Sequence, residues 1–370
     1  MNNNKLLEVY INQKHVGTLA ETKDHLVAFE YSDEWIGSGF SISPVSLPLH
    51  KGVFVPKKYD PFDGVFGVFS DSIPDGWGRL LVDRLLLKNQ INPASVSPLT
   101  RMAIVGNSGM GALEYHPSSD MKADITGMTL DELAVECGKM FDTDNTEHLD
   151  ELFRMGGSSG GARPKVNYEI EGEEWIVKFP SSIDRKYIGR EEYEYSICAK
   201  KCQIPMTDTR LLSSNLYEGY FATKRFDREN GRKIHMVSVS GLLETSHRIP
   251  NLDYNILMQL TLNITHDYEE IEKLFRWMCF NVFAHNRDDH SKNFSYIYED
   301  EGWKLSPAYD LTYSNSINGE HATTVNGNGS NPGMNDILQV AKQVKMDEKK
   351  AQKIACEIRD IVYEDLKKYL

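Results

Sequence analysis

The sequence lacks the features that mark secreted and membrane-spanning proteins. The sequence of 370 residues contains no uncharged apolar run that approaches the ~18 residues needed by a membrane-spanning helix. The first residues, Met1–Lys5, do not begin an apolar segment of the kind found in signal peptides. We therefore expect a cytoplasmic protein with no membrane partner.

Cysteine is scarce and scattered, with five in the chain. Zinc sites and disulfide frameworks need clustered or paired cysteines. Two of the five are four residues apart in a helical pattern, without histidines nearby, so this spacing does not indicate a metal site. We interpret all five as reduced: Cys137, Cys198, Cys202, Cys279 and Cys356.

Positive charge is also scarce, with 41 lysines and arginines against 54 acidic residues and a net charge of −13. Nonspecific binding of nucleic acids draws mainly on lysine and arginine, so the chain alone is a poor candidate for it. The 40% apolar content is enough for sizeable cores. The length fits two or three domains.

Strand and helix patterns occupy different parts of the chain. Residues 5–12 alternate between apolar and polar side chains, and together with residues 15–19 and 27–31 they predict a meander of short strands. A hairpin is expected where Glu171-Gly172 joins two further strand patterns. From about Leu252 the pattern is mostly helical, and 347–369 predict a charged terminal helix. This distribution favours an α+β protein.

The acidic segment Asn286–Asn293 carries the most specific chemical signal. Asp288 and Asn293 are five positions apart, the spacing of the catalytic aspartate and metal-binding asparagine in protein kinases. Asp288 would accept a hydroxyl proton, while Asn293 and the later Asp310 would hold Mg²⁺, which prefers oxygen ligands. An aspartate near a helix end is more often a cap. The combination favours phosphoryl transfer.

A glycine-rich segment, Gly156–Lys165, precedes the predicted hairpin. Its four glycines let backbone N–H groups approach an anion closely because no Cβ intrudes. A flexible linker is an equally good interpretation of such a segment. It is not a Walker A motif, because the Gly-Lys-Ser/Thr ending is missing.

Lys178 lies in the β-favouring run Trp175–Phe179, one hairpin after the glycine-rich segment. This is the position of the phosphate-binding lysine of kinases, although most strand lysines simply face solvent. Glu192, on the next predicted helix, is the expected ion-pair partner. Glu191 and Glu194 have similar spacing and remain alternatives.

Two further nucleotide contacts are less specific. The strand that ends at Thr223–Arg228 would be a kinase hinge if backbone groups of Lys224 and Phe226 met the adenine, but spacing alone favours an ordinary hairpin. His290 could be a metal ligand or a general base. Its aspartate-rich surroundings suit magnesium better than zinc, so we assign it to the nucleotide site.

Together these segments resemble the HipA family of bacterial toxin kinases, over essentially the whole chain. The resemblance covers the serine-containing glycine loop, the lysine strand, the hinge, the catalytic and metal loops, and two N-terminal motifs. These segments are 158–165, 176–180, 225–228, 288–294, 309–311, 29–31 and 44–49.

The resemblance implies a two-lobed protein-kinase-like (HipA / PI3-4-kinase-like) fold. A β-rich N-terminal subdomain would occupy 1–120, part of the kinase N-lobe 121–250, and a helical C-terminal lobe 251–370. Asp288 would be catalytic, and Asn293 and Asp310 would bind Mg²⁺. The implied ATP-binding residues are Ser159, Gly160, Gly161, Ala162, Lys165, Lys178, Glu192, Lys224, Phe226 and His290.

The resemblance also implies an activity and a partner. The activity would be ATP- and Mg²⁺-dependent serine/threonine phosphorylation of a translation-related protein, such as an aminoacyl-tRNA synthetase. Autophosphorylation would occur on Ser158, with Ser159 as the second candidate. A HipB-like helix-turn-helix antitoxin would bind the chain and bring it to DNA only indirectly. Two alternatives stay open: a kinase for a small molecule or lipid, and a non-catalytic corepressor.

Overall fold

The chain divides into two units, each of which is discontinuous in sequence. The computed structural model describes residues 4–118, 127–142, 148–157, 161–316 and 318–370. The first unit comprises Met1–Gly189, Arg210–Val237 and Gly241–Glu244, and the second comprises Arg190–Thr209, Ser238–Ser240 and Thr245–Leu370. The chain crosses between them within α7 (Ile188–Lys201), β8 (Thr209–Leu212), β12 (His235–Ser238) and α8 (Val239–Leu242).

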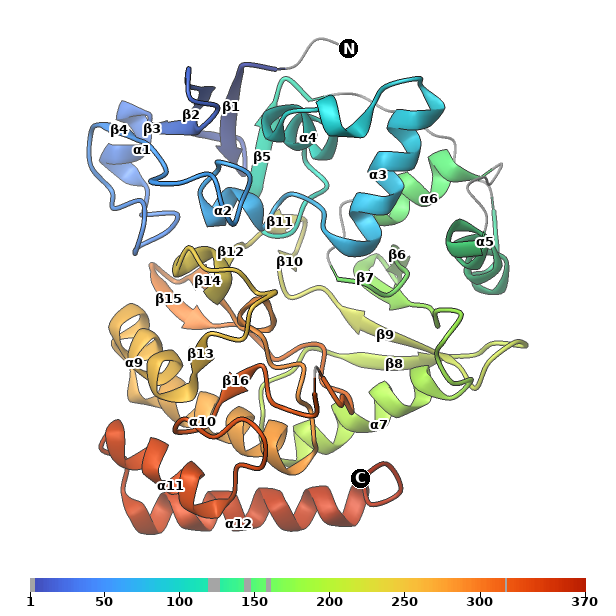
Figure 1. The fold of residues 1–370 in the computed structure, drawn as a ribbon, viewed down its shortest axis with the longest axis vertical. Helices are drawn as coiled ribbons and strands as arrows, with labels where there is room; N and C mark the ends of the chain where they lie inside the picture. Colours follow the sequence, from blue (N-terminus) through green and yellow to red (C-terminus); the bar gives the residue numbers. More distant parts are fainter. Residues whose placement is uncertain (1–3, 119–126, 143–147, 158–160, 317) are drawn as a thin grey trace. The chain divides into compact units, whose positions relative to one another are not determined.

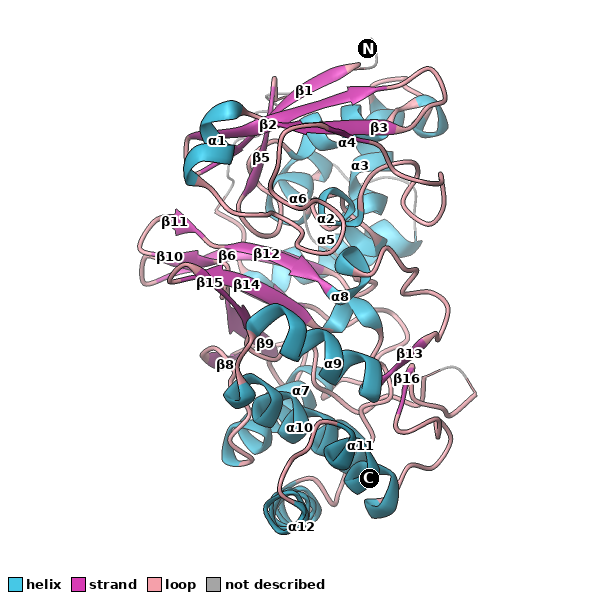
Figure 2. Ribbon diagram, turned by 90° about the vertical axis from the view of Figure 1, so that its left-hand side faces the viewer, coloured by secondary structure: helices cyan, strands magenta, loops and turns pink. Residues whose placement is uncertain are grey.

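A five-stranded sheet begins the first unit, in the order β4-β3-β2-β1-β5, with each neighbouring pair antiparallel (Figure 2). The apolar residues of the alternating first strand, Leu7, Val9 and Ile11, are buried, as a half-buried strand requires. Its strands are β1 (Leu6–Ile11), β2 (Lys14–Glu21), β3 (Val27–Tyr31), β4 (Val53–Phe54) and β5 (Leu113–His116). The helices along this stretch are α1 (Asp33–Ser38), α2 (Gly67–Ser70), α3 (Gly76–Lys88), η1 (Pro93–Ser95) and α4 (Pro98–Val105).

A second sheet, in the order β6-β7-β9-β8, carries the glycine-rich segment at its start. Its strands are β6 (Lys165–Ile170), β7 (Glu173–Lys178), β8 and β9 (Tyr220–Lys224), and a small β10 (Arg228–Glu229)–β11 (Arg232–Lys233) hairpin follows. The predicted turn is present, with Glu171 and Gly172 at φ 56° and 80°.

The two faces of this second sheet differ. Val166, Val177 and Ala222 share a core with residues of α3, α5 (Leu130–Asp142) and α6 (Leu149–Gly156), and α3 lies beside α6 in Figure 1. Cross-strand register places Lys165 and Lys178 on the other face, because successive residues alternate sides.

The second unit is mostly helical. Its central helix, α10 (Tyr268–Phe283), packs against α9 (Tyr254–Thr265) and the terminal α12 (Glu348–Asp365), and α11 (Met334–Gln343) packs on α12 (Figure 1). The strands in this part of the chain are short: β13 (Leu252–Asp253) pairs in parallel with β16 (Thr323–Thr324), and β14 (Ser295–Glu299) forms a hairpin with β15 (Gly302–Leu305). The turn η2 (Ser291–Asn293) precedes that hairpin.

The predicted helical C-terminal region and the terminal helix are therefore present. The boundaries 1–120, 121–250 and 251–370 stay predictions, since the two units are a coarser division. None of the helices in the described ranges is both long and apolar enough to cross a membrane.

Candidate active site

In the segment that follows α10, two adjacent aspartates differ in how far their side chains are exposed to solvent. The side chain of Asp288 is 57% exposed, whereas that of Asp289 is 0% exposed. Only the exposed carboxylate can meet the hydroxyl group of another molecule. The geometry thus supports Asp288, the residue selected by its spacing to Asn293, as the candidate base.

Asp289 belongs instead to a buried hydrogen-bond network. Its Oδ2 accepts hydrogen bonds from the Tyr254 hydroxyl at 2.9 Å and from Nδ1 of His321 at 3.0 Å. Its Oδ1 accepts the backbone N–H of Thr323 at 3.1 Å, and its backbone carbonyl accepts the Thr323 hydroxyl. Burial, together with the charge of Asp289, raises the pKa of Tyr254 well above its usual value, so this hydroxyl stays a donor. The network fixes the backbone one residue after the candidate base.

His290 lies beside the exposed carboxylate. The backbone N–H of Lys292 donates to Nδ1 of His290 at 3.2 Å, so in the neutral ring the proton is on Nε2. This Nε2 is 3.8 Å from Oδ1 of Asp288, too far for a direct hydrogen bond. The ring of His247 lies 5.5 Å from that of His290. His290 therefore presents an N–H toward the candidate base, and its contact with a nucleotide remains a prediction.

The two candidate metal ligands lie on loops that are joined by a hydrogen bond. The Asn293 side-chain N–H donates to the backbone carbonyl of Asp288 at 2.7 Å, so the amide oxygen is not used in this bond. The Tyr309 hydroxyl donates to the carbonyl of Lys292 at 2.7 Å, which links the residues directly before Asn293 and Asp310. Asp310 has a φ of 52°, a left-handed conformation that is uncommon for a residue with a side chain. One amide oxygen and one carboxylate on adjoining loops fit Mg²⁺, which completes its shell with phosphate and water oxygens.

In the first unit, Lys165 and Lys178 project from the same side of the β6–β7 hairpin, where they are direct cross-strand partners. Lys165 is buried, and Nζ of Lys178 lies 5.5 Å from the centre of the Phe221 ring. A Cβ added to Gly161 would be 2.9 Å from Nζ of Lys165, so the glycine makes room for this ammonium group. Two ammonium groups next to the end of the glycine loop are suited to phosphate. Ala162 is exposed, and three predicted residues fall outside the described ones: Ser158, Ser159 and Gly160.

The three candidate glutamates of α7 differ in their surroundings. Glu194 is bound within the second unit, by Nζ of Lys368 at 2.5 Å and by the Tyr369 hydroxyl at 2.8 Å. Glu191 and Glu192 are both buried. The structure therefore leaves Glu192, the predicted partner of the strand lysine, and its neighbour as the candidates.

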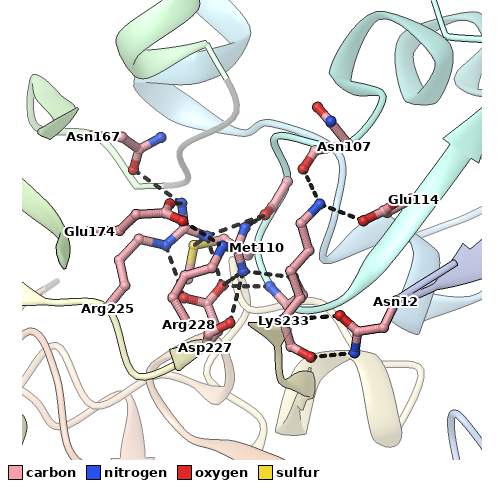
Figure 3. Close-up of polar contacts among 12 residues, drawn as sticks. Asn12, Asn107, Met110, Glu114, Asn167, Glu174, Arg225, Asp227, Arg228 and Lys233 are labelled. Carbon is pink, nitrogen blue, oxygen red and sulfur yellow. Dashed lines mark hydrogen bonds and ion pairs between the residues drawn. The ribbon is translucent and has the colours of Figure 1, made fainter. Parts of the chain in front are cut away.

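The segment predicted as a hinge is held by a buried ion cluster (Figure 3). Two nitrogens of Arg225 bind the two carboxylate oxygens of Asp227 at 2.9 and 2.7 Å, and Arg228 binds Asp227 at 2.9 Å. Burial alone would raise the pKa of Asp227. The charges and hydrogen bonds of the two arginines, with the N–H of Gly111, outweigh burial and lower this pKa to about 2.

The same cluster ties the hinge segment to the loop before β5. Arg225 and Arg228 both donate to the carbonyl of Gly109, at 3.2 and 2.9 Å, and Gly111 donates its N–H to Asp227 at 2.7 Å (Figure 3). The Lys224 side chain forms an ion pair with Glu173. An adenine contact by this segment would therefore use its backbone, as predicted from the sequence for Lys224 and Phe226.

Sequence reasoning did not find the partners of Asp289 and Asp227. The motif at residues 225–228 gives no indication of a structural role for Asp227. Nothing in the sequence points to His321 as the partner of Asp289. A single sequence holds no signal for such pairs, because each joins segments far apart in the chain.

The comparisons with known proteins give the family. Residues 157–365 match the HipA-like C-terminal domain, and residues 7–116 match the HipA N-terminal domain. The chain belongs to the HipA family. This confirms the resemblance seen in the sequence.

Relatives of this HipA-family chain are distant but cover most of it. The Sinorhizobium fredii protein Y4dM, named as a candidate kinase, is 25% identical over 333 residues, 83% of this chain and 76% of the relative. The serine/threonine-protein kinase toxin HipA of Shewanella oneidensis is 21% identical over 340 residues, 82% of this chain and 74% of the relative.

A solved structure supports the fold. The HipA structure from the Shewanella oneidensis complex of HipA, HipB and operator DNA matches with a TM-score of 0.70 at 17% identity, covering 98% of this chain and 90% of that one. The predicted α+β fold of HipA type is confirmed.

Proposed function

We propose that this HipA-family chain is an ATP- and Mg²⁺-dependent serine/threonine protein kinase. The observation that carries the proposal is the arrangement of the catalytic region: an exposed Asp288 beside Asn293, on a loop tied through Tyr309 to the one that bears Asp310. The kinase names of the relatives support the same conclusion.

Each group then has a role in transfer. Lys165 and Lys178 bind phosphate oxygens as cations, and Asn293 and Asp310 would hold the metal. Magnesium, when bound, would neutralise charge on the transferred phosphoryl group. Asp288 accepts the proton of the substrate hydroxyl as that oxygen bonds to the γ-phosphorus of ATP, while the bond from the γ-phosphorus to the β-phosphate oxygen breaks and ADP leaves.

Transfer of labelled phosphate from ATP tests the assignment of Asp288. Asp288→Asn keeps the shape of the side chain but cannot accept the proton, so we expect a loss of roughly 10²–10⁴-fold in rate with ATP affinity retained. Asp300→Asn, at an exposed turn of the β14–β15 hairpin, is the matched control and should transfer phosphate normally. Wild-type activity in Asp288→Asn would exclude Asp288 as the base.

The substrate class proposed is a translation-related protein such as an aminoacyl-tRNA synthetase, and the partner a HipB-like antitoxin. The support for the partner is that the Shewanella HipA was solved with HipB and operator DNA, while the substrate class follows from the resemblance to the HipA family alone. A net charge of −13 fits DNA contact through the partner rather than by this chain alone. Labelling of a cell lysate, followed by identification of the labelled band, tests the substrate. Labelling confined to small molecules would instead support the small-molecule kinase.

Autophosphorylation of Ser158 is part of the same proposal. A phosphate would add about two negative charges to the glycine loop, beside the nucleotide's own, and should drive the loop out of the site. Peptide mapping of wild type, Ser158→Ala and Ser159→Ala distinguishes the two serines. Phosphate found only on other residues would exclude both.

A further inference from the structure

The N-terminus of α3 binds Gly161 and Lys165, in the C-terminal part of the glycine loop, through three hydrogen bonds. The backbone N–H of Gly161 donates to Oδ1 of Asp75 at 2.5 Å, and the backbone N–H of Trp77 donates to the carbonyl of Gly161 at 2.8 Å. The indole N–H of Trp77 donates to the carbonyl of Lys165 at 3.0 Å. We call these bonds the α3–loop contact. They join residues of the HipA N-terminal domain match to residues of the C-terminal one.

The side chain of Asp75 is used in an unusual way. Asp75 is the N-cap residue of α3, yet its carboxylate makes no capping hydrogen bond to that helix. An N-cap aspartate normally accepts an N–H of the first helical turn, which stabilises the helix. Here the carboxylate binds Gly161, 86 residues away in sequence, instead. The carboxylate at the N-cap of α3 therefore binds the glycine loop at Gly161 and not the first turn of its own helix.

The glycines at this contact leave no space for a side chain. Gly76 has a φ of 45°, and a Cβ there would lie 2.2 Å from the carbonyl oxygen of Gly161. At the other described end of the loop, a Cβ on Gly156 would lie 2.6 Å from the carbonyl oxygen of Lys165 and 2.9 Å from Nε1 of Trp77. Trp77 itself is 1% exposed, in the core under the second sheet. The contact is therefore rigid on the α3 side.

We propose that Asp75 and Trp77 are positioning residues that hold Gly161, and the ammonium group of Lys165 beside it, in the arrangement that binds ATP. The inference rests on the proposed kinase function. The N–H of Gly161 donates to Asp75 and so is not available to a phosphate oxygen. Gly161 therefore contributes to a phosphate site by leaving space for the ammonium group of Lys165. Loss of the contact should weaken ATP binding without touching the groups that transfer phosphate.

Substitutions at Asp75 separate the positioning role from ordinary helix capping. Asp75→Ser supplies a good N-cap to α3 but is too short to hold Gly161, so we expect a normal melting temperature, faster hydrogen exchange at Gly161 and a roughly tenfold higher KM for ATP. Asp75→Asn keeps an acceptor oxygen and should restore both values most of the way. The matched control, Asp83→Ala, lies on α3 and removes an ion pair with Arg101 of α4, and it should leave exchange at Gly161 unchanged.

The outcomes are distinct. If Asp75→Ser leaves exchange at Gly161 and the KM for ATP unchanged, the positioning role is wrong. The same holds if Asp75→Ser lowers the melting temperature and both values change only in proportion to that loss of stability. If the wild type does not use ATP at all, the proposed kinase function fails, while exchange at Gly161 still decides whether Asp75 holds the loop.

Discussion

Two buried aspartates, Asp227 and Asp289, stand next to proposed functional segments and are held in opposite ways. Asp227 lies between the guanidinium groups of Arg225 and Arg228. Asp289 is held by a tyrosine hydroxyl, a histidine and a backbone N–H. One segment is fixed by charge and the other mainly by directed hydrogen bonds. This difference predicts which substitutions each position tolerates.

The largest effect is expected at Asp227, because removing its charge leaves two buried guanidinium groups with only their longer ion pairs to the half-exposed Glu174. Asp227→Ala should lower the free energy of unfolding of the first unit by about 3–5 kcal/mol. Asp227→Asn should be nearly as damaging, since it keeps the shape but not the charge. Urea denaturation followed by tryptophan fluorescence measures both.

Glu229→Gln is the control for Asp227, because it removes an exposed carboxylate from the neighbouring strand β10. It should change stability by less than about 0.5 kcal/mol. A stable Asp227→Asn protein would show that hydrogen bonds, and not charge, hold the hinge segment, and the contrast with Asp289 would disappear.

At Asp289 the substitution by asparagine should be much milder than that by alanine. Asp289→Ala leaves the buried donors of Tyr254 and Thr323 without an acceptor, which costs about 1–3 kcal/mol. It should also slow phosphate transfer, because the base Asp288 is the adjacent residue. Asp289→Asn keeps one acceptor oxygen and should recover about half of the stability and much of the rate. Equal losses in the two variants would show that the charge of Asp289 matters as much as that of Asp227.

Low pH should lower the contribution of the Asp227 ion cluster to the free energy of unfolding. The pKa of Asp227 is about 2 in the folded chain against an ordinary value of 3.8, so its ionised form favours folding. This contribution, about 2 kcal/mol, is complete above about pH 5 and is lost as pH falls toward 2. The difference in unfolding free energy between wild type and Asp227→Asn should therefore shrink from pH 7 to pH 3. A constant difference would contradict the lowered pKa.

Local patterns predicted the parts of the fold that depend on neighbours in sequence. The alternation of Leu7, Val9 and Ile11, the turn at Glu171-Gly172 and the five-residue spacing of Asp288 and Asn293 each concern residues within a few positions. Apolar periodicity is visible in one sequence because it repeats, and it is enough to predict strands and helices. The preference for Asp288 over Asp289 rests instead on the five-residue spacing to Asn293.

Polar contacts across the chain left no such signal. Asp75 and Gly161 are 86 residues apart, Asp227 and Gly111 are 116 apart, and Asp289 and His321 are 32 apart. A single buried acceptor does not repeat, and any of many donors could satisfy it. These contacts, which hold the segments that carry the proposed chemistry, could only come from the three-dimensional arrangement.

A further carboxylate, the partly buried Glu244, extends the comparison to a group whose partners do not compensate for the loss of solvent. It accepts the N–H of Gly67 at 3.1 Å, and Asp71 carries a like charge nearby. Burial raises the pKa of Glu244 to about 7. Because the folded pKa lies above the ordinary 4.5, its protonated form favours folding, and stability falls as pH rises through 7. Glu244→Gln, which mimics the protonated group, should raise the melting temperature at pH 8 and leave it unchanged at pH 5. A gain of equal size at both pH values would mean that Glu244 stays ionised like Asp227.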